Sequence, residues 1–455
     1  MTIQLAVVLL GAFAQLVNGA PWPEQVHLSF QGDYSVMGVM WTTFEYDNAA
    51  VQYGTSPTNL PFTATDEGVK QWTSGTSVRY SHKAIMRNLQ PLTKYYYQIG
   101  TRQFSFKTMD KDPQTYKVCI FGDLGYFHGN STESLIRNGL AGKFDFIVHV
   151  GDIAYDLHSE NGAVGDKYMN QLEPLIATVP YMAVAGNHED DGKNFTDYQE
   201  RFWMPDNIYH DHQFYSFDIG PIHWLGVSSE YYGYYYLYGM DPVTNMYEWL
   251  KDDLKAANAN RATTPWIITF QHRPFYCSNT NSVECQSFEN KLIRTGWLDM
   301  PGLEPLFLQY GVDMGFWGHE HSYERMYPIA DRQFWNSTDA YNNPPAPVYV
   351  ITGSAGCHSP YAQFSDNPWP FSAARINDFG YSILTVANST HLHMEQISIE
   401  KNDSVVDEVW VVKDHGYTHS PTVRAQRQGW KFPQMKCHPK NIACRMSLQQ
   451  LNEEL

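Results

Sequence analysis

Positive charge, cysteine and long apolar segments are all scarce in this chain. Its 455 residues carry 31 Lys and Arg against 48 Asp and Glu, a formal net charge of −17. An acidic chain is a poor general binder of nucleic acid or of an anionic membrane surface. After residue 20 no stretch is long and apolar enough to cross a bilayer. Nucleic acid and membrane are therefore not the expected partners.

Residues 1–20 lack charge altogether and hold a short apolar core that ends in small residues. This pattern is typical of a secretory signal peptide, here residues 1–19, cleaved near Gly19 or Ala20, although the usual basic start is missing. The alternative is a short membrane anchor, which the length of the run disfavours. We expect a secreted or lysosomal protein with no membrane attachment after signal removal.

In a secreted protein the six cysteines can form stable disulfides, because disulfides persist in oxidising compartments. Cys119, inside an apolar strand, and Cys357 are either buried thiols or a long-range pair. The other four have spacings that suit two local disulfides: Cys277 with Cys285, and Cys437 with Cys444.

Sequons for N-glycosylation occur five times along the chain. A few could arise by chance in a sequence this rich in Asn, Ser and Thr. Five of them together with a signal peptide indicate a glycoprotein. The acceptors are Asn130, Asn194, Asn336, Asn388 and Asn402.

Residues 22–108 are predicted to form a separate all-β domain. Strand-like runs recur at short intervals with turn signals between them, which is typical of a small β-sandwich. No chemistry is visible in this part, so a packing or positioning role is expected. The runs are Gln25–Phe30, Val36–Phe44, Val51–Tyr53, Tyr80–Met86, Lys94–Ile99 and Phe104–Thr108.

A second, α/β domain is predicted at residues 114–412, after the polar linker Met109–Thr115. Lys117–Phe121, a helix at Thr132–Ala141 and Phe144–Val150 form a βαβ unit, which implies parallel strands. Further strands are expected at Val179–Ala185, Phe214–Ile219, His223–Ser228, Trp266–Gln271, Val312–Trp317 and Val348–Thr352. Further helices are expected at Asp166–Ile176, Pro242–Asn258 and Cys285–Tyr310, the last broken at Pro301-Gly302.

The end of the second domain returns to short strands, so that its last strands span about 346–412. These are expected at Tyr381–Val386, Thr390–Ile399 and Ser404–Val412. The tail, residues 413–455, is polar and irregular, and its expected disulfide would pin it.

Five polar clusters each follow an apolar strand of the second domain. In open α/β sheets, sites form outside the carboxyl ends of the strands. A single Gly-Asp is most often a turn, and a lone His is most often structural. The evidence for a functional site is therefore the occurrence of all five clusters in one domain. The clusters are Gly122-Asp123-Leu124-Gly125, Gly151-Asp152-Ile153-Ala154-Tyr155, Gly186-Asn187-His188-Glu189, His272 and Gly318-His319-Glu320-His321.

The clusters together predict a site for two metal ions. Oxygen ligands mixed with imidazoles suit Fe, Zn or Mn, and do not suit Mg or Ca. Seven ligands are too many for one tetrahedral ion and suit two ions about 3.5–4 Å apart that share a carboxylate. Asp152 is placed to be that carboxylate. The predicted ligands are Asp123, Asp152, Tyr155, Asn187, His272, His319 and His321.

These motifs, in this order, resemble the calcineurin-like metallophosphoesterases. Gly125 stands where many of those enzymes have a histidine, and Tyr155 joins the second cluster, which narrows the resemblance to the purple acid phosphatases. The first domain, with its Leu89–Tyr97 corner, is similar to the fibronectin type III-like domain of the long forms of that family. The runs HRPFYCSN and GHEHSYERMYP look most like its animal, acid phosphatase type 7-like branch.

The resemblance implies a binuclear acid phosphatase that hydrolyses phosphate monoesters by attack of metal-bound hydroxide. A trivalent ion lowers the pKa of bound water further than a divalent ion does, so hydroxide survives at acidic pH. The family pattern assigns Fe(III) to Asp123, Asp152, Tyr155 and His321, and a divalent Fe, Zn or Mn ion to Asp152, Asn187, His272 and His319, with Asp152 bridging.

His188 matches a histidine that contacts phosphate in the family and is the candidate to protonate the leaving group. The alternative is that it only orients the metal ligands. Plant long forms carry an adjacent histidine pair in the loop after the fourth cluster, and Cys277–Ser287 has no histidine. The identity of the general acid therefore stays open.

Three further alternatives follow from the sequence. The run Tyr231–Tyr238 could stack on an aromatic leaving group, although packing against itself is the favoured interpretation. The same metal pair could serve a phosphodiesterase or a pyrophosphatase. A non-catalytic secreted binding protein is disfavoured because all seven ligand positions are filled. The oligomeric state is not predicted.

Overall fold

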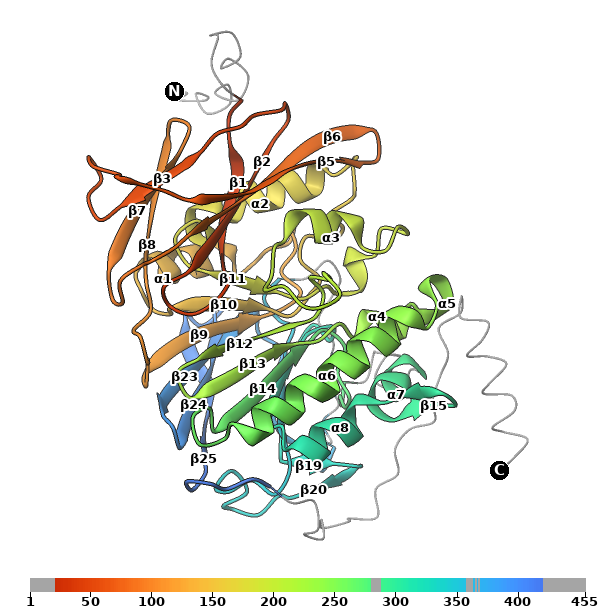
Figure 1. Cartoon of the computed structure of the whole chain (residues 1–455). Coiled ribbons are helices and arrows are strands. Elements are labelled where there is room, and N and C mark those ends of the chain that lie inside the picture. The colour runs from red at the N-terminus through yellow and green to blue at the C-terminus, as the bar shows by residue number, and fades with distance from the viewer. Residues whose placement is uncertain (1–20, 280–287, 357–362, 365, 367–368, 420–455) are drawn as a thin grey trace, which may run out of the picture.

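Two four-stranded β-sheets form the N-terminal part of the computed structural model, which describes residues 21–279, 288–356, 363–364, 366 and 369–419 (Figure 1). One sheet has the order β1 (Glu24–Phe30), β2 (Met37–Thr43), β6 (Ser77–Met86), β5 (Thr65–Ser74). The other has the order β4 (Phe62–Thr63), β3 (Val51–Gly54), β7 (Lys94–Ile99), β8 (Arg102–Lys107). Apolar side chains such as Val39 and Tyr97 fill the core of this part. The predicted β-sandwich is confirmed.

The prediction missed the edge strands β4 and β5. The sequence of β5, TDEGVKQWTS, carries charged side chains and most of its residues are exposed. A strand at the edge of a sheet needs no strict alternation of apolar and polar residues, so it leaves no period of two in the sequence.

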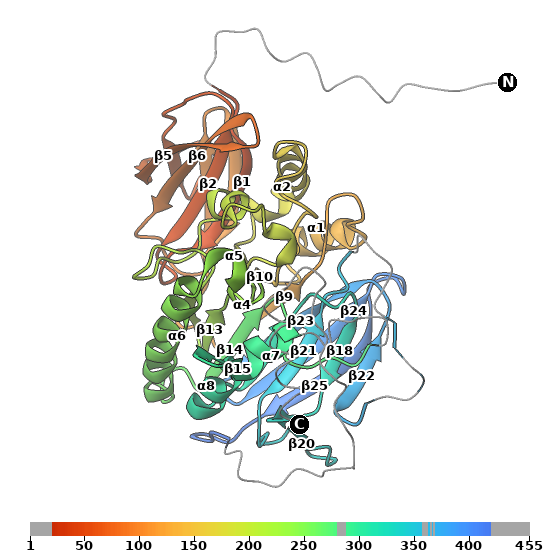
Figure 2. The ribbon, with the colours of Figure 1, turned by 90° about the vertical axis from the view of Figure 1, so that its right-hand side faces the viewer.

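Two larger mixed sheets form the centre of the second domain (Figure 2). The six-stranded sheet has the order β11 (Tyr181–Ala183), β10 (Phe146–His149), β9 (Tyr116–Phe121), β23 (Gly380–Asn388), β24 (His391–Ser398), β25 (Ser404–Val412). The seven-stranded sheet has the order β12 (Tyr215–Ile219), β13 (Ile222–Gly226), β14 (Trp266–Gln271), β17 (Met314–Trp317), β21 (Val348–Thr352), β18 (Tyr323–Met326), β22 (Ser372–Ile376). Strands β9, β10 and β11 run parallel, as do β13, β14, β17 and β21. The expected α/β architecture is confirmed.

Helices cover these sheets close to the predicted positions. The sequence located α1 (Thr132–Leu140), α2 (Ala163–Ile176) and α6 (Asp241–Ala259) to within a few residues. Figure 2 shows α6, α7 (Phe288–Thr295) and α8 (Leu303–Tyr310) beside the seven-stranded sheet. In the described part no helix is both long enough and apolar enough to span a bilayer.

The prediction of helix over Cys285–Tyr310 is wrong for the residues between α7 and α8. There the chain forms a small hairpin of β15 (Gly296–Trp297) and β16 (Met300–Pro301). Gly296 has a φ of 76°, which side chains other than glycine rarely adopt. A Cβ atom on Gly302 would lie 2.2 Å from the carbonyl carbon of Thr295. The break therefore begins five residues earlier than the Pro301-Gly302 pair suggested.

The cysteine and sequon predictions are tested only in part. Cys119 is a free, buried thiol. Cys277 is disulfide-bonded, but the other four cysteines lie outside the described residues, so the two pairings stay predictions. Among the five sequon asparagines, Asn336 is half-buried and the other four are exposed. Glycosylation stays a prediction.

His223 in β13 lies between two carboxylates of neighbouring elements. Its Nδ1 is 2.7 Å from Asp218 Oδ1 and its Nε2 is 2.8 Å from Asp253 Oδ2. Burial disfavours the charged ring, but the two carboxylates prevail and raise the pKa of His223 to about 9. Because an unfolded histidine has a pKa near 6.5, this stabilisation is fully present below about pH 6.5 and is lost as pH rises through about 9.

We expect His223→Gln to lower the free energy of unfolding by roughly 2 kcal/mol at pH 6. The difference from the unsubstituted protein should shrink towards zero above about pH 9, where His223 is neutral in both states. Guanidinium unfolding at pH 6 and pH 9.5 measures it. A difference that stays the same at both pH values would contradict the charged state assigned to His223.

Candidate metal centre

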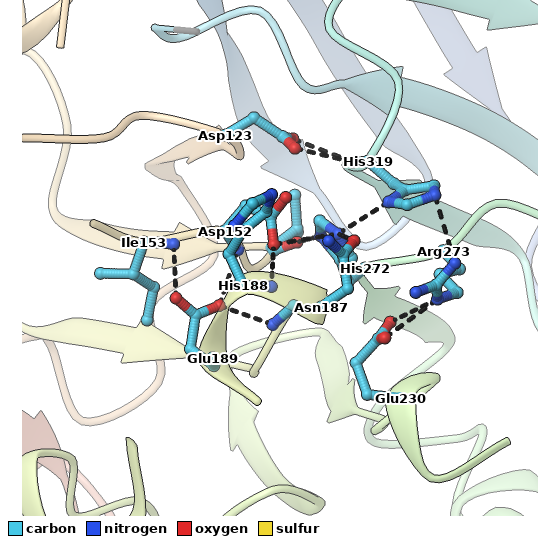
Figure 3. Close-up of polar contacts among 12 residues, drawn as sticks. Asp123, Asp152, Ile153, Asn187, His188, Glu189, Glu230, His272, Arg273 and His319 are labelled. Carbon is cyan, nitrogen blue, oxygen red and sulfur yellow. Dashed lines mark hydrogen bonds and ion pairs between the residues drawn. The ribbon is translucent and has the colours of Figure 1, made fainter. Parts of the chain in front are cut away.

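The seven predicted ligands follow the carboxyl ends of five parallel strands. Those from β9, β10 and β11 come from the six-stranded sheet, and those from β14 and β17 come from the seven-stranded sheet. Figure 3 shows how the side chains that follow these two sheets converge: Asp123, Asp152, Asn187, His272 and His319. The structure therefore brings together side chains that lie up to about 200 residues apart in the chain.

One set of ligands surrounds His272. Its Nε2 lies 3.3 Å from Asp152 Oδ1, 3.0 Å from Asn187 Oδ1 and 3.1 Å from Nδ1 of His319. One ligand atom from each of Asp152, His272 and His319 falls within 4.8 Å of the others. The Nδ1 of His272 donates to the carbonyl of Val150 at 2.9 Å, which turns Nε2 towards the site.

The second set surrounds His321. Its Nε2 lies 2.7 Å from the Tyr155 hydroxyl and 3.5 Å from Asp123 Oδ1. The same hydroxyl lies 3.4 Å from Asp123 Oδ1. Ligand atoms of Asp123, Asp152 and His321 also fall within 4.8 Å of one another. Asp152 thus belongs to both sets, in agreement with a bridging role.

Left-handed backbone conformations mark the ligand positions. The φ angles are 60° at Asp123, 51° at Asp152, 49° at Tyr155 and 71° at His319. Such conformations at non-glycine residues cost on the order of 1–3 kcal/mol each, and they cluster at functional sites. Space is equally tight, since a Cβ atom on Gly186 would lie 2.4 Å from Asp152 Oδ1. The turns are therefore shaped for the site at the expense of local stability.

Glu189 fixes the turns that carry two of the ligands. Its buried carboxylate accepts hydrogen bonds from the backbone N–H groups of Asp152 at 2.9 Å, Ile153 at 2.9 Å and Gly186 at 2.8 Å (Figure 3). Burial, and then the nearby Asp152 carboxylate, raise the pKa of Glu189 to about 8. Sequence reasoning placed Glu189 beside the ligands without a role, although its motif GNHE was visible.

The ligand set fits a pair of cations. Burial, together with the charge of Asp123, raises the pKa of the Asp152 carboxyl. A cation between these carboxylates would favour their charged forms. Carboxylate, amide and phenol oxygens with imidazole nitrogens match the preferences of Fe, Zn and Mn.

His188 lies beside the metal ligands and is open to solvent. Its Nδ1 is 2.6 Å from Asp156 Oδ1, and its backbone N–H donates to Asp152 Oδ1 at 2.9 Å. The ring packs 4.4 Å from that of Tyr155, and the side chain is 36% exposed. Burial lowers the pKa of His188, but Asp152 and Asp156 prevail and raise it to about 9. No sequence pattern predicts the contact between His188 and Asp156.

The tyrosine-rich run lies in α4 (Glu230–Gly233) and α5 (Tyr235–Tyr238) and in the residue between them. The ring of Tyr234 lies 6.3 Å from that of Tyr236 and 6.4 Å from that of Tyr238, which agrees with the favoured self-packing. The Tyr234 hydroxyl also donates to the carbonyl of Asn187 at 3.1 Å. The run therefore touches the site as well as itself.

Comparisons with known proteins agree with this geometry. Residues 116–323 match the family model described as calcineurin-like phosphoesterase. Residues 23–108 match that of the purple acid phosphatase N-terminal domain, and residues 346–408 that of iron/zinc purple acid phosphatase-like protein C. A solved structure of a purple acid phosphatase from yellow lupin seeds shares the fold with a TM-score of 0.72 and 24% identity, over 87% of this chain and 75% of that one.

Curated relatives extend the agreement over most of the sequence. Acid phosphatase type 7 of Homo sapiens is 40% identical over 415 residues, which cover 89% of this chain and 94% of the human protein. Phosphoenolpyruvate phosphatase of Allium cepa is 31% identical over 398 residues, which cover 81% of this chain and 77% of the onion protein. The chain therefore belongs to the purple acid phosphatase family and is a phosphatase that acts on phosphate esters.

Proposed function

We propose that this phosphatase hydrolyses phosphate monoesters at acidic pH, at a centre of Fe(III) and a divalent ion. The observation that supports it is the division of the seven ligands into two sets that share Asp152. Asp123, Tyr155 and His321 complete the set assigned to Fe(III), for which a phenolate is a suitable ligand. Asn187, His272 and His319 complete the set assigned to divalent Fe, Zn or Mn. Two bound cations would hold phosphate oxygens and lower the pKa of a water molecule.

His188 is proposed as the group that protonates the leaving oxygen. The Asp156 carboxylate holds Nδ1 of the ring at 2.6 Å, so Nε2 is the nitrogen that would carry the proton to the leaving oxygen. Partial exposure of the side chain is consistent with such access. A general acid must first lie within hydrogen-bond reach of the leaving group, and only then does its pKa matter.

We expect His188→Ala to lower turnover by about 10²–10⁴-fold while both metal ions stay bound. Kinetics combined with elemental analysis of the purified variant measures this. His210 offers a matched control, because it pairs with Asp206 at 2.9 Å in the same way but is 81% exposed and lies outside the ligand sets. Loss of a metal ion from His188→Ala would assign His188 to ligand positioning instead.

The metal assignment has a spectroscopic test. A broad purple charge-transfer band in the oxidised protein, lost in Tyr155→Phe, is the expected signature of an Fe(III)–tyrosinate. A colourless protein that binds two zinc or manganese ions would remove iron from the proposal. Faster hydrolysis of bis-p-nitrophenyl phosphate than of p-nitrophenyl phosphate would refute the monoester assignment.

Secretion and the domain boundaries are part of the same proposal. Residues 1–19 are proposed as a signal peptide, residues 22–108 as the N-terminal domain and residues 114–412 as the catalytic domain. Expression in a eukaryotic secretory host tests the first of these. Release into the medium of a glycosylated protein that begins near Ala20 is the expected result, and an uncleaved N-terminus would refute it.

A further inference from the structure

A buried ion pair lies directly against His319. The Nε of Arg273 donates to both carboxylate oxygens of Glu230, at 3.0 and 2.9 Å. The Glu230 side chain is fully buried and that of Arg273 is 11% exposed. The Nη1 of the same guanidinium lies 3.3 Å from Nε2 of His319. The pair therefore sits beside a predicted metal ligand without being part of either ligand set.

The guanidinium occupies the side of His319 that faces away from the site. Figure 3 shows Arg273 beyond His319, on the side away from Asp123 and Asp152. The Nδ1 of His319 points the other way, 3.1 Å from Nε2 of His272. Because an imidazole ring can rotate about its Cβ–Cγ bond, a fixed neighbour at Nε2 keeps Nδ1 directed at the site.

Metal binding would change the kind of contact that the pair makes with Nε2 of His319. Without a metal ion, Nη1 of Arg273 donates to Nε2 of His319. A cation held by Nδ1 would place the proton of the neutral ring on Nε2. The guanidinium cannot accept that proton, so the Glu230 carboxylate is the acceptor that the pair would offer to this N–H. Glu230 balances the charge of Arg273, so the pair adds little net repulsion towards a cation.

The ion pair also connects α4 to the ligands of one predicted ion. Glu230 is the first residue of α4, and the backbone N–H of Arg273 donates to Ser229 Oγ at 2.8 Å. Tyr234, which directly follows α4, donates to the carbonyl of Asn187 at 3.1 Å. Asn187 and His319 both belong to the set assigned to the divalent ion, and neither belongs to the Fe(III) set.

We propose that Glu230 and Arg273 are positioning residues for the divalent ion, which hold His319 in its binding orientation and so set the affinity of that ion alone. This inference rests on the two-ion assignment of the proposed function. A buried ion pair often contributes little to stability compared with apolar residues of the same size. Orientation of His319 would explain why a buried ion pair of Glu230 and Arg273 lies at this position.

The test removes the pair without leaving a lone buried charge. Arg273→Met combined with Glu230→Gln takes out both charges at similar side-chain volume. The matched control is Arg294→Met combined with Glu304→Gln, because that pair is joined at 2.9 Å and buried to a similar degree, with 6% and 3% exposure. Each protein is loaded with iron and zinc and dialysed against graded chelator, and its metal content is measured by mass spectrometry.

We expect the Arg273/Glu230 double variant to hold the divalent ion about 10–100-fold more weakly. The affinity for the Fe(III) ion and the purple band of that ion should be the same as in the unsubstituted protein. The control should retain both ions. Equal affinities in the Arg273/Glu230 variant and the unsubstituted protein would overturn the inference, as would equal metal loss from the control. An unsubstituted protein that binds fewer than two ions would instead refute the proposed function.

Discussion

Asp152→Ala is expected to remove both metal ions and to lower turnover on the order of 10³-fold or more. Asp152 belongs to both ligand sets, with an oxygen 3.3 Å from Nε2 of His272. Its loss would leave each ion one ligand short at the same time. It would also leave the backbone N–H of His188 without the Asp152 oxygen that it contacts at 2.9 Å.

Elemental analysis and steady-state kinetics on the same preparation measure both effects. Asp211→Asn is a suitable control, because Asp211 is half-buried and accepts a hydrogen bond from Gln213 N at 2.9 Å but lies outside the ligand sets. We expect it to keep both ions and most of the activity. If Asp152→Ala kept two ions with unchanged affinity, the shared carboxylate would have to be another residue.

The convergence of the candidate ligands could be predicted from the sequence because each one follows its strand within a few residues. A buried strand and the turn after it are local features, and the parallel arrangement then carries their ends to one edge. Asp123 and Asp152 illustrate this, since β9 and β10 are parallel neighbours with Phe121 opposite His149. The order of the strands in space was not needed to predict these ligands.

The groups that hold the ligands in place could not be predicted in the same way. Glu230 and Arg273 lie 43 residues apart, and Asp156 meets His188 across 32 residues. Neither contact has a period or a spacing that a sequence pattern would show. The position of Asp156 depends on the left-handed backbone of the preceding residue, Tyr155, which has a φ of 49°.

Strands also escaped prediction where burial comes from tertiary packing alone. The sequence of β18, YERM, contains two charged residues, yet all four residues are buried. Arg325 of this strand is bonded to Asp407 of the neighbouring sheet at 2.7 Å, and that contact allows the charge to be buried. The alternation of apolar and polar residues in a sequence cannot predict a partner such as Asp407, which lies 82 residues away.

Asp166→Ala should lower the free energy of unfolding by about 3–5 kcal/mol at pH 7. Asp166 lies on α2 and accepts hydrogen bonds from Arg79 Nε of β6 at 2.9 Å and from Arg201 Nη1 at 2.8 Å. The two arginine side chains are 2% and 1% exposed. Removing the shared carboxylate would leave two buried guanidinium groups without this partner, between the N-terminal sheet and α2.

The same residue predicts a dependence on pH. Burial alone would raise the pKa of Asp166, but the hydrogen bonds and charges of Arg79 and Arg201 prevail and lower it. A carboxylate with a depressed pKa contributes stability above its unfolded value, near 3.9, and loses it as pH falls through the folded value. The difference between Asp166→Ala and the unsubstituted protein should therefore be full at pH 5 to 7 and decrease below about pH 3.9.

Denaturant unfolding at pH 7, 5 and 3 measures this dependence. The exposed pair of Glu248 and Lys251, 2.7 Å apart, supplies the control, and Glu248→Ala should change stability by less than about 1 kcal/mol. A similarly small effect of Asp166→Ala would show that water reaches the two arginines and compensates them. An effect that is large at both pH 7 and pH 5 would instead mean that Asp166 contributes much of the attachment of the N-terminal sheet, and that this attachment persists at the acidic pH where we expect the enzyme to work.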